Sequence, residues 1–179
     1  MLTITIPAKD LFNESTSEFI SVKETILDLE HSLISISKWE QKFHKPFLSR
    51  EAKTHEEIIH YIKCMTINKN VDPNVYYALT KKNIDEIKAY IDDPMTATRI
   101  TSSKANVSRE IITSEIIYFW MIEHDIPHQF ERWHINRLLT LIRVCNEKSK
   151  STNKMSKKDI MNQNRTLNEQ RRKMCHSTG

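Results

Sequence analysis

Glycine is almost absent from this chain, and its absence limits what the chain can fold into. The 179 residues contain one glycine, Gly179, at the last position. Glycine enters left-handed backbone conformations without steric cost, and phosphate-binding loops and tight hairpin turns depend on it. A P-loop, a GxGxxG dinucleotide turn and a GxSxG nucleophile elbow are therefore absent, and an all-β fold is disfavoured. The sequence instead favours helices joined by polar loops.

The bulk composition indicates a protein with a hydrophobic core and no membrane span. Hydrophobic residues make up 39% of the chain and charged residues 28%, enough for a core and a polar surface. No apolar run approaches the roughly 18 residues of a membrane helix, and residues 1–10 lack the pattern of a signal peptide. Cys64, Cys145 and Cys175 are far apart in sequence, which indicates a reducing compartment. We therefore expect a cytoplasmic protein.

Hydrophobic periodicity predicts one short strand followed by helices. Residues 2–6 alternate apolar and hydroxyl side chains, which predicts a strand or an extended arm. Thr54 followed by Glu57 is a capping-box pattern, and Asp72 before Pro73 is typical of a helix start. A loop without periodicity is expected over 95–108. Helical spacing of apolar residues predicts helices over 24–44, 54–65, 83–91, 108–126 and 128–147.

The charge distribution changes after residue 147. Residues 148–179 contain nine Lys or Arg and two acidic residues, a net +7, which leaves −3 of the total +4 for residues 1–147. With so few apolar side chains, this tail cannot bury much surface unless it orders on a partner. The predicted fold is mainly α: an N-terminal extended arm at 1–10, a helical core domain at 11–147, and a basic linker and C-terminal helix at 148–179.

Three histidines raise metal binding as an alternative. His124, His128 and His134 lie near carboxylates, and imidazole with carboxylate suits zinc. Their spacing matches no HExxH pattern, and Pro127 breaks the helix between His124 and His128. Polar residues at the turn between two helices therefore explain these histidines better than a zinc site does. "WHINR" shares His134 and Asn136 with HNH nucleases, but no second histidine follows at a suitable distance, and the PCxxC of zinc deaminases is absent. We predict no catalytic residues, no metal and no cofactor.

The basic tail leaves nucleic-acid binding open as another alternative. Nine cations would attract phosphates, and such binding weakens steeply between about 50 and 200 mM salt. The tail has no aromatic residue for base stacking, and the rest of the chain is mildly acidic. An acidic protein helix would fit the same charges. Charge alone does not separate these partners.

Five blocks of the sequence stand out together: "LEHSLISISKWEQKFHKPFL" (29–48), "THEEIIHYIKCMTI" (54–67), "MTATRI" (95–100), "RWHINRLLTLIRVC" (132–145) and "NKMSKKDIMNQNRTLNEQRRK" (153–173). Taken in order, these blocks resemble the small tail assembly chaperones of long-tailed bacteriophages. They extend over most of the chain, from residue 29 to residue 173, and contain no catalytic signature. Such proteins are encoded just before the tape measure protein, and many exist in short and frameshift-extended forms. The resemblance implies binding of the long helical tape measure during tail assembly, in the cytoplasm of the bacterial host.

This function implies apolar contacts rather than chemistry, because helix-in-groove binding uses apolar side chains at helical spacing. We expect a homo-oligomer, or a hetero-oligomer with the frameshift-extended form, and no membrane partner. The alternative is a structural tail or neck protein that stays in the virion. Aromatic and aliphatic candidates fit a core as well as an interface, and the core is favoured. The candidate partner-binding residues are Trp120, Met121, Trp133 and Leu138 in the body and Arg165, Arg171 and Arg172 in the tail.

Overall fold

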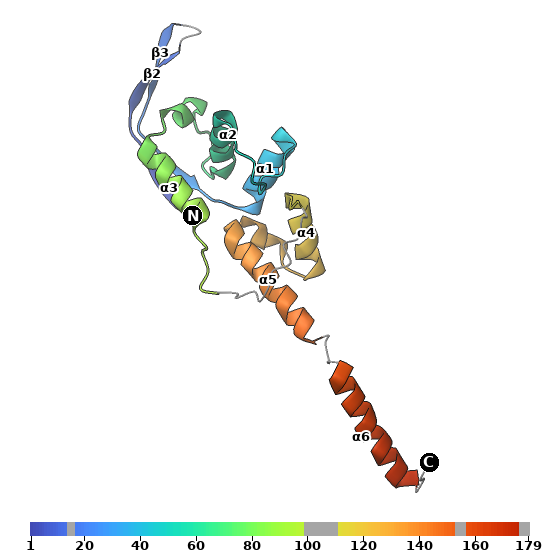
Figure 1. Cartoon of the computed structure of the whole chain (residues 1–179). Coiled ribbons are helices and arrows are strands. Elements are labelled where there is room, and N and C mark those ends of the chain that lie inside the picture. The colour runs from blue at the N-terminus through green and yellow to red at the C-terminus, as the bar shows by residue number, and fades with distance from the viewer. Residues whose placement is uncertain (14–16, 99–110, 153–156, 176–179) are drawn as a thin grey trace. The chain divides into compact units, whose positions relative to one another are not determined.

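A computed structural model of the chain contains two compact units, Met1–Ile142 and Arg143–Gly179, which we describe separately. The described residues are 1–13, 17–98, 111–152 and 157–175 (Figure 1). They are mostly helical, as the sequence indicates, with two small antiparallel sheets at the N-terminus. Within these ranges, no helix is long and apolar enough to cross a membrane.

Residues 1–13 and 17–29 form a long β-ribbon. Its strands are β1 (Leu2–Ile6), β2 (Lys9–Asn13), β3 (Glu18–Val22) and β4 (Thr25–Leu29). Strand β1 pairs with β4 and strand β2 with β3, both antiparallel. The two pairs share one register, because the residue numbers of facing partners have the same sum in both, as in Leu2 with Leu29 and Lys9 with Val22. The ribbon therefore continues in register from one pair to the other and is interrupted beside Pro7, which has no backbone N–H to donate.

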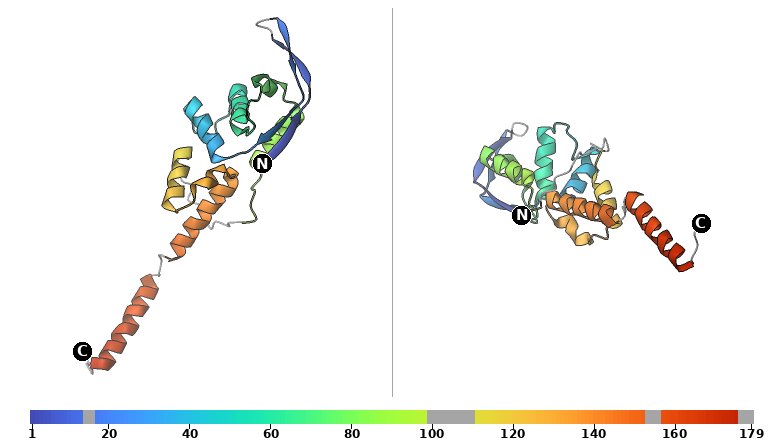
Figure 2. Two further views of the ribbon diagram at one scale, coloured as in Figure 1. Left: turned by 180° about the vertical axis from the view of Figure 1, so that it is seen from behind. Right: turned by 60° about the horizontal axis from the view of Figure 1, so that its bottom comes forward.

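Along the first arm of the ribbon, the buried side chains change from even to odd positions. The β1–β4 half buries Ile4 and Ile6, and β1 lies against helix α3 (Lys81–Asp92; Figure 2). The β2–β3 half instead packs Leu11 against the core and leaves Phe12 and Phe19 exposed, with their rings 5.1 Å apart. Two-stranded ribbons twist strongly, which allows the buried side to pass from even to odd positions.

The helices begin where the sequence supplies capping side chains. Thr54 Oγ1 accepts from the Glu57 N–H at 3.2 Å, and Glu57 Oε2 accepts from the Thr54 N–H at 2.8 Å, which confirms the predicted capping box. Asp72 caps the 3-10 helix that begins at Pro73, as predicted. Besides α3, the helices are α1 (Leu33–Phe43), α2 (His55–Met65), η1 (Pro73–Ala78), α4 (Ser114–Glu123), η2 (His128–Arg132), α5 (Ile135–Thr152) and α6 (Lys157–Cys175).

One hydrophobic core joins the ribbon to helices α1 to α5. Trp39 of α1 lies fully buried, and its indole N–H donates to the Glu57 carbonyl of α2 at 2.9 Å. The core buries aliphatic side chains from both ends of the first unit, which include Leu27, Ile62, Ile117 and Ile135. Because residues 4 to 142 contribute to this one cluster, the first unit has a single core.

Several predicted boundaries are wrong. The helix predicted over 24–44 is helical over Leu33–Phe43, whereas Thr25–Leu29 is strand β4, so the helical part does not begin at residue 11. The helix predicted over 128–147 is two elements, η2 and α5, because Ser32 pairs with His134 and the Ile135 N–H donates to the His31 carbonyl at 2.8 Å. The helix near 83–91 begins earlier, at Lys81, capped by Thr80.

The region before α4 is described in part. Residues 95–98 of the predicted loop have no helix or strand. The rest of the predicted loop and the predicted helix start at residue 108 lie outside the described residues. The compact units divide between Ile142 and Arg143, inside α5, rather than at residue 147.

The near-absence of glycine has a visible structural effect. Among the described residues, five that are not glycine take positive φ angles between 49° and 57°, the left-handed region that glycine favours. His44 holds this conformation just after α1, and its N–H donates to the Glu40 carbonyl at 2.8 Å. The five residues are Ser17, His44, Asn70, Met95 and Asp125.

Candidate interaction surface

A buried carboxylate holds helix α4 on helix α1. Glu40 of α1 is buried, and its Oε2 accepts from the Ser114 N–H at the first turn of α4, at 2.8 Å. Its Oε1 accepts from the Phe47 N–H at 2.7 Å. A negative group at a helix N-terminus satisfies an unpaired N–H and interacts favourably with the helix dipole. Glu40 therefore fixes the start of α4, although 74 residues separate it from Ser114 in sequence.

The inner side of α4 packs in the core, and side chains after the C-terminal end of α4 make polar contacts with the helix. Ile117 and Met121 are buried, and the Tyr118 hydroxyl donates to Glu131 Oε2 at 2.9 Å. His128 Nε2 lies 3.0 Å from the same oxygen, and its ring stacks on Tyr118. Burial, and then the hydrogen bond to Glu131, raise the pKa of Tyr118, so the phenol keeps its proton and remains the donor.

The opposite side of α4 exposes large apolar side chains. Phe119 is 60% exposed and Ile122 76% exposed. They are three residues apart and so adjacent on the helix surface, with Glu115 and Glu123 four residues on either side of Phe119. We call these four residues the outer face of α4. A surface helix normally has a polar outer side, so two exposed apolar side chains together indicate a contact surface.

The surroundings of this face are acidic. Residues 111–131 contain four carboxylates and no Lys or Arg. Glu115 lies at the first turn of α4, where hydrogen bonds from its own N–H and from Thr113 lower its pKa. A depression of about 600 Å³ adjoins this end, and its lining includes Glu115, Gln41 of α1, and His44 and Lys45 just after α1. The outer face thus combines apolar contact area with negative charge.

The candidate residues of the body fall into two groups. Met121 and Leu138 are buried, so their predicted contact with a partner is wrong for the folded chain, and the core alternative holds. Trp120 and Trp133 are half-buried against the core. Trp133 is predicted to be helical, but it lies outside the helices, directly after η2. Its ring stacks on Phe130 with centroids 4.0 Å apart, and the Arg137 guanidinium lies 3.8 Å from the centroid of the Trp133 ring. Contact of the two tryptophans with a partner stays a prediction.

Periodicity reasoning missed Phe119 and Ile122. The stretch 115–122 is apolar almost all round, which indicates that part of it is buried without indicating which part. The buried side is set by contacts with α1, which is distant in sequence. In the second unit, Arg165, Arg171 and Arg172 are all exposed on α6, and Arg165 Nε lies 3.5 Å from Glu169 Oε1.

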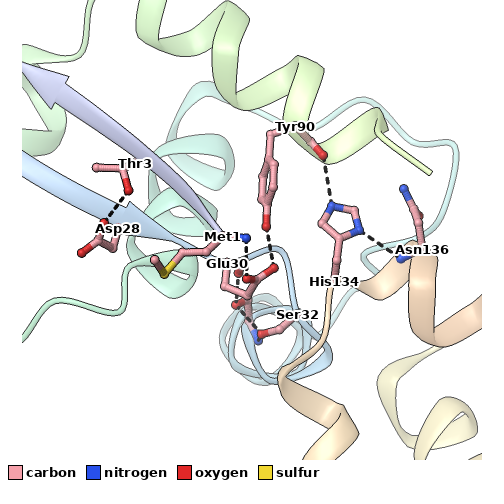
Figure 3. A network of polar contacts seen from close by, with 9 residues as sticks. Met1, Thr3, Asp28, Glu30, Ser32, Tyr90, His134 and Asn136 are labelled. Carbon is pink, nitrogen blue, oxygen red and sulfur yellow. Dashed lines mark hydrogen bonds and ion pairs between the residues drawn. The ribbon is translucent and has the colours of Figure 1, made fainter. Parts of the chain in front are cut away.

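A second cluster of polar side chains lies inside the first unit (Figure 3). The Tyr90 hydroxyl donates to Glu30 Oε1 at 2.6 Å, and the amino group of Met1 lies 3.0 Å from the other carboxylate oxygen. The Asn136 N–H donates to His134 Nδ1 at 3.3 Å, so Nε2 carries the proton and donates to the Tyr90 carbonyl at 3.0 Å. This cluster connects the end of β4, α3 and the start of α5.

Two histidine rings of this cluster are in contact and buried. The rings of His31 and His134 meet edge to face with centroids 4.9 Å apart, and His31 Nδ1 hydrogen-bonds to the Tyr61 hydroxyl. Burial, and then the neighbouring His134 ring, lower the pKa of His31 to about 3. Burial also lowers the pKa of His134. Both rings are therefore neutral near pH 7, and their hydrogen bonds position backbone segments.

Two of the three histidines considered for a metal site have different surroundings in the structure. His134 is buried in the polar cluster, whereas His128 pairs with Glu131 at the end of α4. Among the described residues, no group of three or more His, Cys, Asp or Glu side chains is placed to hold a metal ion. The candidate functional surface is the outer face of α4, because it exposes Phe119 and Ile122 side by side.

The chain was compared with known proteins on three levels. No protein-family model, no curated protein and no solved structure matches it.

Proposed function

We propose that this chain is a non-enzymatic tail assembly chaperone that binds the tape measure protein through the outer face of α4. One observation carries the proposal: Phe119 and Ile122 expose most of their side chains on a helix whose inner side is fixed in the core. An apolar face of this kind suits an amphipathic helix of the client, which would bury its own apolar residues there. The order of sequence blocks in the chain supports the phage assignment.

The partner test is co-expression with the tape measure protein encoded after this chain, followed by affinity capture. We expect the native chain to retain the tape measure in soluble form. The double substitution Phe119→Ser and Ile122→Ser should abolish retention, since it removes the apolar contact area. The matched control, Phe12→Ser with Phe19→Ser, removes another exposed apolar pair, on the β-ribbon, and should retain the client. Equal retention by both variants would refute the role of α4.

The fate of the protein separates a chaperone from a structural component. Mass spectrometry of infected-cell lysate and of purified particles should find the chain with the tape measure in the lysate and missing from the particles. A fixed copy number in the particles would instead identify a tail or neck protein of the virion.

A further inference from the structure

Helix α6 has an exposed stripe whose chemistry complements the outer face of α4. Leu167 is 44% exposed and Met174 83% exposed, and they lie seven residues apart, nearly on the same line along the helix. Arg171 lies between them, four residues after Leu167 and three before Met174, on the same side. Arg172 lies about 140° around the helix from Leu167. The stripe Leu167–Arg171–Met174 is therefore apolar and basic on one side of α6.

The two surfaces both present apolar side chains, and they carry opposite charge. The outer face of α4 presents Phe119 and Ile122 between the carboxylates of Glu115 and Glu123, within an acidic segment. Helix α6 has six Lys or Arg and two acidic residues, a net +4, against −4 for residues 111–131 with histidines neutral. Apolar side chains would meet apolar side chains, and Arg171 would meet a carboxylate. Complementary charge of this kind selects a partner and sets its register.

We propose that helix α6 of a second copy of this chain covers the outer face of α4. Leu167 and Met174 pack against Phe119 and Ile122, and Arg171 pairs with Glu123. One ten-residue helix is about 15 Å long, too short to bury the area of a stable interface by itself. A reciprocal exchange, in which each copy gives α6 to the other, doubles the contact in a two-fold dimer. The inference does not depend on the proposed function, because it requires no client.

Self-association of the full chain tests this proposal directly. Sedimentation equilibrium over a concentration series should give a mass above the 21.2 kDa of one chain. Leu167→Asp should weaken the association about tenfold or more, as should Phe119→Ser with Ile122→Ser. Arg171→Glu should weaken it too, whereas Arg172→Glu makes the same charge change on the other side of α6 and should not. Combining Arg171→Glu with Glu123→Arg should restore association, which loss of folding would not allow.

Cross-linking distinguishes a second copy from the same chain. In a Cys175→Ser background, one tagged chain carries Ile122→Cys and a differently tagged chain carries Leu167→Cys. A disulfide that joins the two tags supports the proposal. A chain that carries both cysteines and closes on itself at high dilution would overturn it. A native chain that stays monomeric over the whole concentration series, or equal effects of Arg171→Glu and Arg172→Glu, would overturn it as well.

Discussion

At the scale of single residues, the chain buries polar groups that hold distant segments together. His134, Tyr90 and Glu30 lie in three different elements or turns, and each hydrogen bond between them joins segments at least 44 residues apart. A buried polar group is costly when it loses its partner, so each of these side chains fixes the position of another.

The buried histidines should make the fold sensitive to mild acid. Their pKa values are lowered in the folded chain, to about 3 for His31, whereas an unfolded histidine titrates near 6.5. Below about pH 6.5 the unfolded state therefore binds protons that the folded state does not. The free energy of unfolding should fall by up to about 1.4 kcal/mol per pH unit through His31 as the pH drops from 6.5 towards 3, and the lowered pKa of His134 should add to this fall.

Urea denaturation at pH 7, 6 and 5 measures this slope. His31→Phe should flatten it, whereas His55→Gln, which changes an exposed histidine, should leave it unchanged. Equal slopes in all three proteins would contradict a role for His31.

Glu40 should contribute to stability through the two backbone N–H groups that it accepts. Glu40→Gln keeps the size of the side chain but replaces one carboxylate oxygen by an amide group, which cannot accept. We expect a loss of about 1–3 kcal/mol in the free energy of unfolding, and faster hydrogen exchange at the Ser114 amide. The exposed neighbour Gln41→Ala serves as control. If hydrogen exchange became faster at the Phe47 amide but not at the Ser114 amide, Glu40 would not cap α4.

At the scale of elements, local signals located helices more accurately than they assigned the faces of those helices. The capping box at Thr54 and the proline at position 73 needed only neighbouring residues, and both appear as predicted. Residues 25–29 form a strand and not the predicted helix. The spacing of their apolar residues fits a helix and a strand alike, and pairing with residues 2–6 makes them a strand. The break between η2 and α5 likewise depends on Ser32 and His31, about a hundred residues earlier.

The two sides of α4 should respond differently to substitution. Met121→Ala, in the core, should cost about 2–5 kcal/mol of unfolding free energy because it leaves a cavity. Phe119→Ser and Ile122→Ser, on the outer face, should each change it by no more than about 0.5 kcal/mol. Chemical denaturation of the three variants checks this contrast at low protein concentration, where self-association does not contribute. A large loss for Phe119→Ser would mean that the outer face is needed for folding.

At the scale of the whole molecule, the first unit contains the hydrophobic core and the outer face of α4, and the second unit contains α6. The buried residues of the hydrophobic core lie between Ile4 and Ile142, within the first unit. The second unit carries the basic stripe of α6. If α6 of a second copy covers the outer face of α4, a client helix must displace it, so association between copies and client binding should compete. No property of one isolated helix would reveal this competition, since it depends on two surfaces far apart in sequence.

Removing α6 should separate folding from association. A chain that ends after Thr152 should unfold with nearly the same free energy as the full chain, because no core residue that the structure describes comes from α6. It should also sediment as a monomer. Calorimetry and sedimentation of the shortened chain check both expectations. A shortened chain that unfolds at much lower temperature would show that α6 stabilises the first unit.

The left-handed residues described above have a practical meaning for anyone who needs a more robust sample. Met95 and His44 hold positive φ angles at a cost of roughly 1–2 kcal/mol each, a cost that glycine avoids. His44→Gly and Met95→Gly should therefore raise the melting temperature, while Lys38→Gly, inside α1 and exposed, should lower it. Because the chain uses other residues where glycine would fit better, the substitutions at His44 and Met95 should give a more heat-stable protein for crystallisation or long storage.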